Sequence, residues 1–117
     1  MGRPIVHVEI MGRDARKLQA FYADLFDWRI SAPSGPEFGF YGMLDPASSG
    51  LGGGIGQEPG GHGRVTVYVE VPDAQAALDR AVSLGGTVAL PPTQIPGGPK
   101  IAQFVDPDGN ITGLMEA

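Results

Sequence analysis

The sequence of 117 residues contains no cysteine, which excludes a disulfide framework, thiolate metal ligands and a cysteine nucleophile. It has only 18% charged residues, with eight basic side chains against 13 acidic ones and a formal net charge of −5. A chain without a basic surplus is a poor partner for nucleic acid or an anionic membrane. No apolar run approaches the roughly 20 residues that span a bilayer. We therefore expect a cytoplasmic protein that binds neither nucleic acid nor membrane.

Glycine and proline are abundant instead. The chain has 19 glycines and 11 prolines, a content that approaches that of disordered chains. A hydrophobic content of 42% argues against disorder, because such a chain can bury enough apolar surface to offset the entropy of ordering. The glycines therefore need a structural or functional explanation. At this length we expect one folded domain over residues 1–117.

Two segments of the chain repeat the same order of features. Residues 5–11 and 64–71 alternate along the chain and are rich in β-branched side chains, which predicts half-buried strands. An aspartate suited to cap a helix follows each strand, Asp14 in the first segment and Asp73 in the second. These aspartates lie about half the chain apart, so the sequence predicts a duplicated unit.

Each aspartate precedes an amphipathic pattern of about three helical turns. In the first helix the helical spacing predicts a stripe of side chains that lies in the core, with Trp28 closing the helix against the sheet. The stripe consists of Leu18, Phe21, Tyr22, Leu25 and Phe26. Short strands separated by glycine and proline follow each helix. The predicted strands cover residues 28–31, 38–44 and 51–57 in the first half, and 87–90, 100–105 and 111–116 in the second.

The predicted fold class is α+β, with two βαβββ units over about residues 3–58 and 63–117. Each unit is expected to be a mixed sheet with one covering helix. Along the first strand, Val8 alternates with His7 and Glu9, so the apolar set should pack under the helix and the polar set on the other face. Two such sheets side by side would form a cup-shaped half-barrel.

Two short motifs accompany the duplicated units. The first helix ends with FYADLFDW at residues 21–28, and FVDPDGN at residues 104–110 precedes the last strand. Together with the repeated βαβββ order, these features resemble the vicinal oxygen chelate superfamily, which includes glyoxalase I, bleomycin-resistance proteins and extradiol dioxygenases. The resemblance covers nearly the whole chain, and within the superfamily it is greatest to small glyoxalase-like proteins of unassigned reaction.

The resemblance implies four positions for ligands of a divalent ion, on the first and last strands of each unit. These positions hold His7, Gly54, Thr66 and Gly113. Such an ion needs several oxygen or nitrogen donors, and glycine has no side chain to supply one. We therefore expect no metal or other cofactor. The glycines should instead open space for a ligand or another backbone.

His7 and Glu9 are the candidates for catalysis. An imidazole within a strand can contact a ligand, act as a general base or bind a metal, or it can be a structural histidine held by Glu9 or Tyr68. A carboxylate within a strand must be solvated or paired, and this applies to Glu9 and to Glu70. The residues expected to line a ligand pocket are Tyr41, Gly54, Thr66, Tyr68, Glu70, Gln103 and Gly113. Phe38 and Phe40 are further pocket candidates, because one alternate set of the strand that holds Tyr41 must face the cup.

The leading hypothesis is a protein that binds a small carbonyl-containing or aromatic metabolite or antibiotic in a concave pocket, without a metal. The alternative is a metal-assisted lyase, isomerase or dioxygenase-like enzyme that uses His7, with Glu9 or Glu70 assisting. A third hypothesis is an interaction module whose cup is closed by a partner subunit. The resemblance also implies a homodimer.

Overall fold

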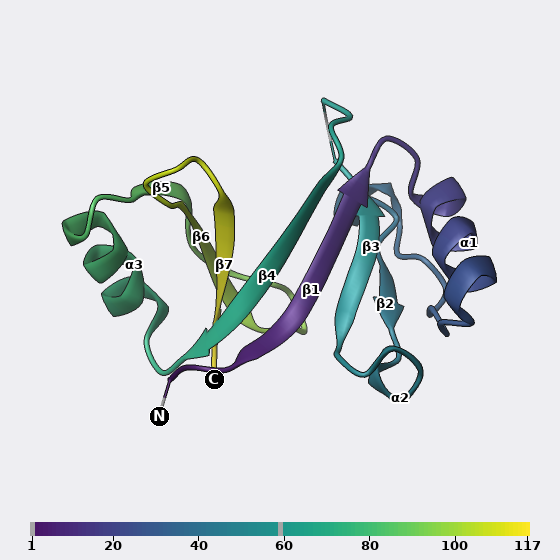
Figure 1. The fold of residues 1–117 in the computed structure, drawn as a ribbon, viewed down its shortest axis with the longest axis horizontal. Coiled ribbons are helices and arrows are strands. Elements are labelled where there is room, and N and C mark those ends of the chain that lie inside the picture. The colour runs from purple at the N-terminus through teal and green to yellow at the C-terminus, as the bar shows by residue number, and fades with distance from the viewer. Residues whose placement is uncertain (1, 59) are drawn as a thin grey trace. The chain divides into compact units, whose positions relative to one another are not determined.

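The computed structural model describes residues 2–58 and 60–117, and the chain divides into two compact units (Figure 1). The Val6–Val65 unit is one continuous segment. The Thr66–Ala117 unit also includes the chain before Val6. The sequence predicts units of residues 3–58 and 63–117, and a single domain over the whole chain stays a prediction.

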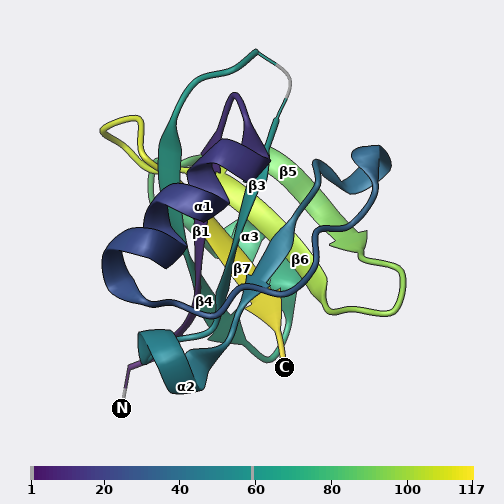
Figure 2. The same ribbon diagram turned by 90° about the vertical axis from the view of Figure 1, so that its right-hand side faces the viewer.

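The Val6–Val65 unit holds a mixed sheet of three strands in the order β2-β3-β1. Strand β1 pairs in parallel with β3, and β2 pairs antiparallel with β3. Helix α1 lies over this sheet (Figure 2). The elements are β1 (Ile5–Gly12), α1 (Ala15–Phe26), the 3₁₀ turn η1 (Pro36–Phe38), β2 (Gly42–Leu44), the short helix α2 (Pro46–Ser49) and β3 (Gly53–Gln57).

Asp14 caps α1 as predicted, because its Oδ1 accepts a hydrogen bond of 3.1 Å from the backbone N–H of Lys17. Helix α1 packs on the sheet through Leu18 and Tyr22, which contact a buried cluster of Ile10, Leu44 and Ile55. Val8 packs against the same cluster. The apolar side chains of β1 therefore face α1, and its polar side chains face away, as the alternation predicts.

The predicted core role is confirmed for Leu18, Tyr22 and Trp28, which pack against the buried cluster, but it is wrong for three other side chains at the end of α1. Phe21, Leu25 and Phe26 are 58%, 58% and 52% exposed. The buried residues of the helix are Ala15 and Gln19, because α1 meets the sheet along a narrower stripe. The amide of Gln19 donates to the backbone oxygens of Phe40 and Ile55 over 2.9 and 2.7 Å, which satisfies this buried polar group.

The segment between α1 and β3 corrects the predicted strands. Residues 28–31 contribute a single bridge, from Ile30 to Leu44. The predicted strand at 38–44 is reduced to β2, because Gly39 and Phe40 have left-handed φ angles of 66° and 51° that interrupt an extended chain. Strand β3 starts at Gly53 rather than at residue 51.

The Thr66–Ala117 unit holds a mixed sheet in the order β4-β7-β6-β5, with β4 and β7 parallel. Helix α3 packs on it over a core of Val71, Ala74, Leu78, Ala102 and Leu114. Strand β5 extends beyond the predicted end at residue 90, and its pairing with β6 shifts register on both sides of Leu90. The elements are β4 (Arg64–Val71), α3 (Ala74–Ser83), β5 (Thr87–Gln94), β6 (Lys100–Val105) and β7 (Ile111–Glu116).

The α+β class and the duplicated order are confirmed. Each unit pairs its first strand in parallel with its last, β1 with β3 and β4 with β7. One departure is that the Val6–Val65 unit has the Ile30 bridge in place of a full second strand. Among the described residues, no helix is both long and apolar enough to cross a membrane.

Candidate functional site

Two glycines of β3, Gly54 and Gly56, lie beneath the ring of Tyr41. Because Ile55 belongs to the core beside α1, Gly54 and Gly56 face the opposite side of the sheet. A Cβ atom at Gly54 would overlap two ring carbons and the hydroxyl oxygen of Tyr41, and one at Gly56 would lie 2.8 Å from Tyr41 Cδ1. Gly54 does not have a left-handed φ. The tyrosine ring, rather than the backbone conformation, therefore requires glycine at position 54.

The hydroxyl of Tyr41 links two side chains of β1. Its oxygen lies 2.9 Å from Nε2 of His7, and the hydroxyl donates a hydrogen bond of 3.2 Å to Oε2 of Glu9. A hydroxyl has one proton, so Nε2 of His7 must carry the proton of the other hydrogen bond. In the neutral imidazole of His7, Nε2 therefore carries the proton and Nδ1 has the free lone pair.

Arg64 holds Glu9 in this arrangement. Its Nη2 lies 3.1 Å from Oε1 of Glu9 and 3.0 Å from Oε2 of Glu58. The Arg64, Glu9 and Glu58 side chains are 22%, 13% and 28% exposed, so these charges are largely removed from water and depend on one another. We call the residues His7, Glu9, Tyr41, Glu58 and Arg64 the Tyr41 cluster.

Arg64 and Glu58 were not predicted as site residues. The sequence indicates only that Glu9 is solvated or paired. The available signal was an arginine at the start of a strand predicted to be half-buried. Arg64 lies far along the chain from Glu9, and no spacing rule joins residues that distant.

Burial lowers the pKa of His7 below its usual value of 6.5, and the negative charge of Glu9 opposes part of this shift. The imidazole is therefore neutral at pH 7. This is the form that can act as a base.

The lowered pKa of His7 predicts a pH dependence of stability. Below about pH 6.5, the unfolded chain takes up a proton at His7 that the folded chain resists, so the free energy of unfolding falls as the pH decreases through that range. In His7→Gln this fall should be smaller. Urea unfolding at a series of pH values from about 7.5 down measures it. If the free energy of unfolding changed equally with pH in the wild type and in His7→Gln, the lowered pKa of His7 would be contradicted. His62→Gln is the control for removing an exposed histidine.

In the Thr66–Ala117 unit a tyrosine ring also covers a glycine, but Tyr68 belongs to the strand paired with Gly113, whereas Tyr41 precedes β2 and the strand partner of Gly54 is Glu9. Tyr68 and Gly113 are register partners in β4 and β7, and a Cβ atom at Gly113 would overlap the Tyr68 ring. The hydroxyl of Tyr68 accepts a hydrogen bond of 2.7 Å from Nε2 of Gln103. Tyr68 and Thr66 are only 2% and 1% exposed, whereas Glu70 is partly exposed on the same strand. Three predicted pocket residues, Tyr68, Gln103 and Gly113, are therefore brought together.

Two expectations are corrected here. Gly54 and Gly113 do not open empty space, because a tyrosine ring fills the volume above each of them. A strand glycine permits such close approach, and in both units the approaching group is an aromatic ring. His7 is held by Tyr41, which the sequence analysis did not consider as its partner.

The residues do not fit the divalent ion implied by the fold family. In the Val6–Val65 unit, Nε2 of His7 is hydrogen-bonded to Tyr41 and Gly54 offers no donor. In the other unit, the positions hold a buried threonine, Thr66, and Gly113 beneath a ring. Within residues 2–58 and 60–117, no group of three or more histidine, aspartate or glutamate side chains could hold an ion.

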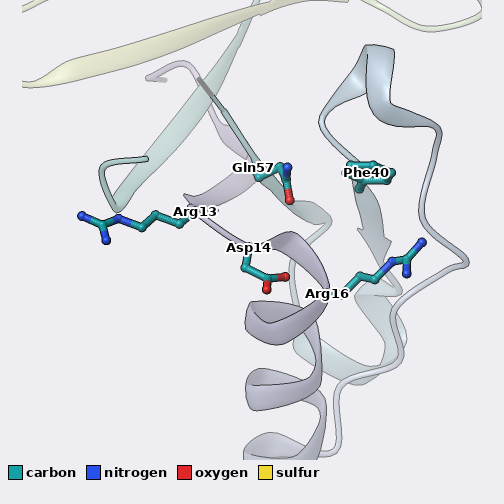
Figure 3. Close-up of a pocket in the computed structure, with 5 residues that line it drawn as sticks. All are labelled: Arg13, Asp14, Arg16, Phe40 and Gln57. Carbon is teal, nitrogen blue, oxygen red and sulfur yellow. The ribbon is translucent and has the colours of Figure 1, made fainter. Parts of the chain in front are cut away.

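Two hollows open elsewhere on the Val6–Val65 unit. One, of about 390 Å³, is lined by Arg13, Asp14, Arg16, Phe40 and Gln57 (Figure 3). Figure 3 shows Arg13 and Arg16 pointing away from each other on either side of Asp14, and the guanidinium carbon of Arg16 lies 5.6 Å from the centre of the Phe40 ring. A second hollow lies beside Trp28, Ile30 and Pro33. Of the residues that the sequence assigns to a pocket, only Phe40 lines one of these two hollows.

Several solved structures have a similar fold at low sequence identity. A hypothetical protein from Bacillus halodurans C-125 matches with a TM-score of 0.74 and 11% identity, over 100% of this chain and 96% of that one. Methylmalonyl-CoA epimerase from Mycobacterium tuberculosis matches with a TM-score of 0.70 and 16% identity, over 96% and 86% of the two chains. A superfamily member from Vibrio splendidus 12B01 matches with a TM-score of 0.67 and 16% identity, over 99% and 100%.

A search of curated proteins found no match. The family model named Glyoxalase, for the glyoxalase, bleomycin resistance protein and dioxygenase superfamily, matches residues 4–113. This match extends over parts of both units and includes both tyrosine–glycine pairs. The chain therefore belongs to the Glyoxalase/Bleomycin resistance protein/Dioxygenase superfamily.

Proposed function

We propose that this protein binds a small carbonyl-containing or aromatic metabolite or antibiotic at the Tyr41 cluster, without the divalent ion of its family. The observation that carries the proposal is the Tyr41 hydroxyl held between His7 and Glu9 on the sheet face away from α1. A partly buried imidazole, phenol and carboxylate supply donors and acceptors for a polar ligand. The tyrosine ring adds a flat apolar surface with a polar end.

Relatives suggest which compounds to test first. One solved methylmalonyl-CoA epimerase, 18% identical, is in complex with methylmalonyl-CoA and an ammonium ion. The family name includes bleomycin resistance proteins. A carbonyl-containing thioester and an antibiotic are therefore the first two probes, and acetophenone, a simple aromatic ketone, is the third.

Nuclear magnetic resonance titration of the ¹⁵N-labelled full chain tests the proposal. Methylmalonyl-CoA, metal-free bleomycin and acetophenone are each added in the presence of EDTA. We expect at least one of them to shift the signals of His7 and Tyr41 to saturation. Tyr41→Phe should weaken that binding about fivefold to tenfold, because the phenol hydrogen bonds are lost.

Tyr22→Phe is the matched control, because Tyr22 packs on the core side of α1 and its change should leave the affinity unaltered. If all three probes leave His7 and Tyr41 unshifted, the proposal is wrong. Equal weakening by Tyr22→Phe and Tyr41→Phe would also argue against the Tyr41 cluster as the binding site.

A second candidate function is an isomerase or lyase that uses His7 as a general base. The lowered pKa of His7 favours it, because a neutral imidazole can accept a proton at pH 7. Incubation of methylmalonyl-CoA with the protein in D₂O tests it by deuterium incorporation. Incorporation that is lost in His7→Gln and retained with EDTA supports this candidate, and incorporation that EDTA abolishes supports the metal-assisted alternative.

A further inference from the structure

We infer that the outer face of α1 is a self-association surface, on which a second copy of this chain docks its own α1 in the antiparallel direction. This surface is separate from the proposed ligand site, because the Tyr41 cluster lies on the sheet face away from α1. A second copy on α1 therefore leaves the Tyr41 cluster of the same unit uncovered.

The second half of α1 carries large apolar side chains that the fold does not cover. Phe21, Leu25 and Phe26 are 58%, 58% and 52% exposed. Phe21 and Leu25 are four residues apart, so they are neighbours on the helix surface. Exposed apolar side chains that occur singly are normal, whereas aromatic side chains gathered on one surface are typical of the centre of a protein interface.

The exposed rings rest on rings that the core holds in place. The Phe21 ring meets Tyr22 edge to face with its centre 5.2 Å away, and the centre of the Phe26 ring lies 5.1 Å from that of Trp28. Tyr22 and Trp28 both pack against the buried cluster beneath α1. The outward rings are therefore positioned before a partner arrives, which lowers the entropy cost of association.

The charges of α1 run against its helix dipole. Arg16 and Lys17 lie in the first turn, which has no acidic residue, and Asp24 lies in the last turn, which has no basic residue. A helix dipole favours the opposite order, and α3 follows that rule with Arg80 in its last turn. Apart from the capping Asp14, the charges of α1 thus do not stabilise the isolated helix, but they match a second helix of opposite direction.

A second copy of α1 supplies that helix. One helix face carries Lys17, Phe21, Asp24 and Leu25, which follow one another by three or four residues or by one. In an antiparallel pair whose two-fold axis passes near Phe21, Lys17 lies beside the partner's Asp24, and the apolar side chains between them meet. A two-fold interface makes each contact twice. A parallel pair would bring like charges together, so the charge order selects the antiparallel one.

The length of α1 sets the expected affinity. A helix of 12 residues buries less surface than an interface of standard size, so we expect a weak dimer with a Kd of about 10–100 µM. Analytical ultracentrifugation of the full chain measures it. The wild type should be mostly dimeric at about 0.5 mM and monomeric at about 1 µM.

The apolar contacts are tested with the variant F21Q/L25Q, which should weaken the dimer about tenfold or more. The matched control is V82Q/L84Q, because Val82 and Leu84 are apolar residues at the end of α3 that are 46% and 64% exposed. This control should leave the Kd unaltered. If F21Q/L25Q dimerises as tightly as the wild type, the dimer uses another surface and the inference is wrong.

The charge order is tested by reversing it. K17E and D24K should each weaken the dimer about fivefold, because each places like charges together at both ends of the interface, and K17E/D24K should regain the wild-type Kd. R3E and D79K are the charge-matched controls at exposed positions outside α1. Both single changes on α1 bring its charges into agreement with the helix dipole, so the melting temperature of the monomer should not fall, which separates docking from folding.

Two further results would overturn the inference. One is a wild type that stays monomeric at about 0.5 mM, because α1 would then face a partner other than a second copy. The other is a double reversal, K17E/D24K, that dimerises no better than the single variants, because the two charges would then not meet across the interface.

Discussion

Gly113→Ala is expected to lower the free energy of unfolding by about 3 kcal/mol, near the upper end for overpacking a core. The added methyl group would overlap the ring of Tyr68. That ring is 2% exposed and its hydroxyl is held by Gln103, so it has no route to the surface. Because the ring cannot move, the overlap must distort the hydrogen-bonded pairing of β4 and β7, where Tyr68 and Gly113 are register partners. Urea unfolding followed by circular dichroism measures the loss.

Gly52→Ala is the control for adding a methyl group to a glycine of ordinary backbone conformation. Its Cβ atom would meet only the Val6 backbone oxygen, at 3.8 Å, so a change within about 0.5 kcal/mol is expected. If Gly113→Ala were as stable as Gly52→Ala, the close packing of Tyr68 on Gly113 would be refuted.

Gly54→Ala is expected to cost about 2 kcal/mol. Its methyl group would overlap the Tyr41 ring and hydroxyl. Unlike Tyr68, Tyr41 is only partly buried, so the ring can move away from β3. That movement relieves the overlap but breaks the hydrogen bonds to His7 and Glu9, which is why the expected cost is smaller than for Gly113→Ala.

A double-mutant cycle separates the cost of the overlap with Tyr41 from any other cost of replacing Gly54. In the Tyr41→Ala background, Gly54→Ala should cost no more than about 0.5 kcal/mol, because the group that it would overlap is gone. The expected coupling between the two positions is therefore about 1.5 kcal/mol or more. Additive effects of the two substitutions would show that position 54 needs glycine for another reason.

The parts of the fold that local patterns specify were predictable. The alternation in residues 5–11 and 64–71 predicts both first strands, and the capping aspartates Asp14 and Asp73 mark both helix starts. The same alternation places His7 and Glu9 on the face away from α1. These features depend on residues that are neighbours along the chain, so the sequence is sufficient for them.

The contacts of the site were not predictable, because they depend on the path of the chain between α1 and β3. Two consecutive left-handed residues, Gly39 and Phe40, interrupt the beginning of the predicted strand just before Tyr41, whose ring lies over β3. Phe40 has no sequence signal for that conformation. The resemblance identifies position 54 as a ligand position, but it contains no information on which side chain fills the space above a glycine.

The charge network of Glu9 also depends on tertiary structure. Arg64 reaches Glu9 from a strand that begins far along the chain, and the sequence indicates only that Glu9 is either solvated or paired. The predicted homodimer and cytoplasmic location concern the protein's partners and surroundings, so both stay predictions.

The ¹⁵N imidazole spectrum of His7 in the wild-type chain, recorded before and after one equivalent of Zn²⁺, tests the central claim most directly. The chain has two histidines, and His62→Gln assigns their signals. If the Tyr41 hydroxyl holds Nε2 of His7 and the site works without a divalent ion, His7 shows the neutral tautomer protonated on Nε2 at pH 7 and its signals do not change with Zn²⁺. Loss of the Nε2 proton, with a saturating shift of the His7 signals at one equivalent of Zn²⁺, would contradict the account.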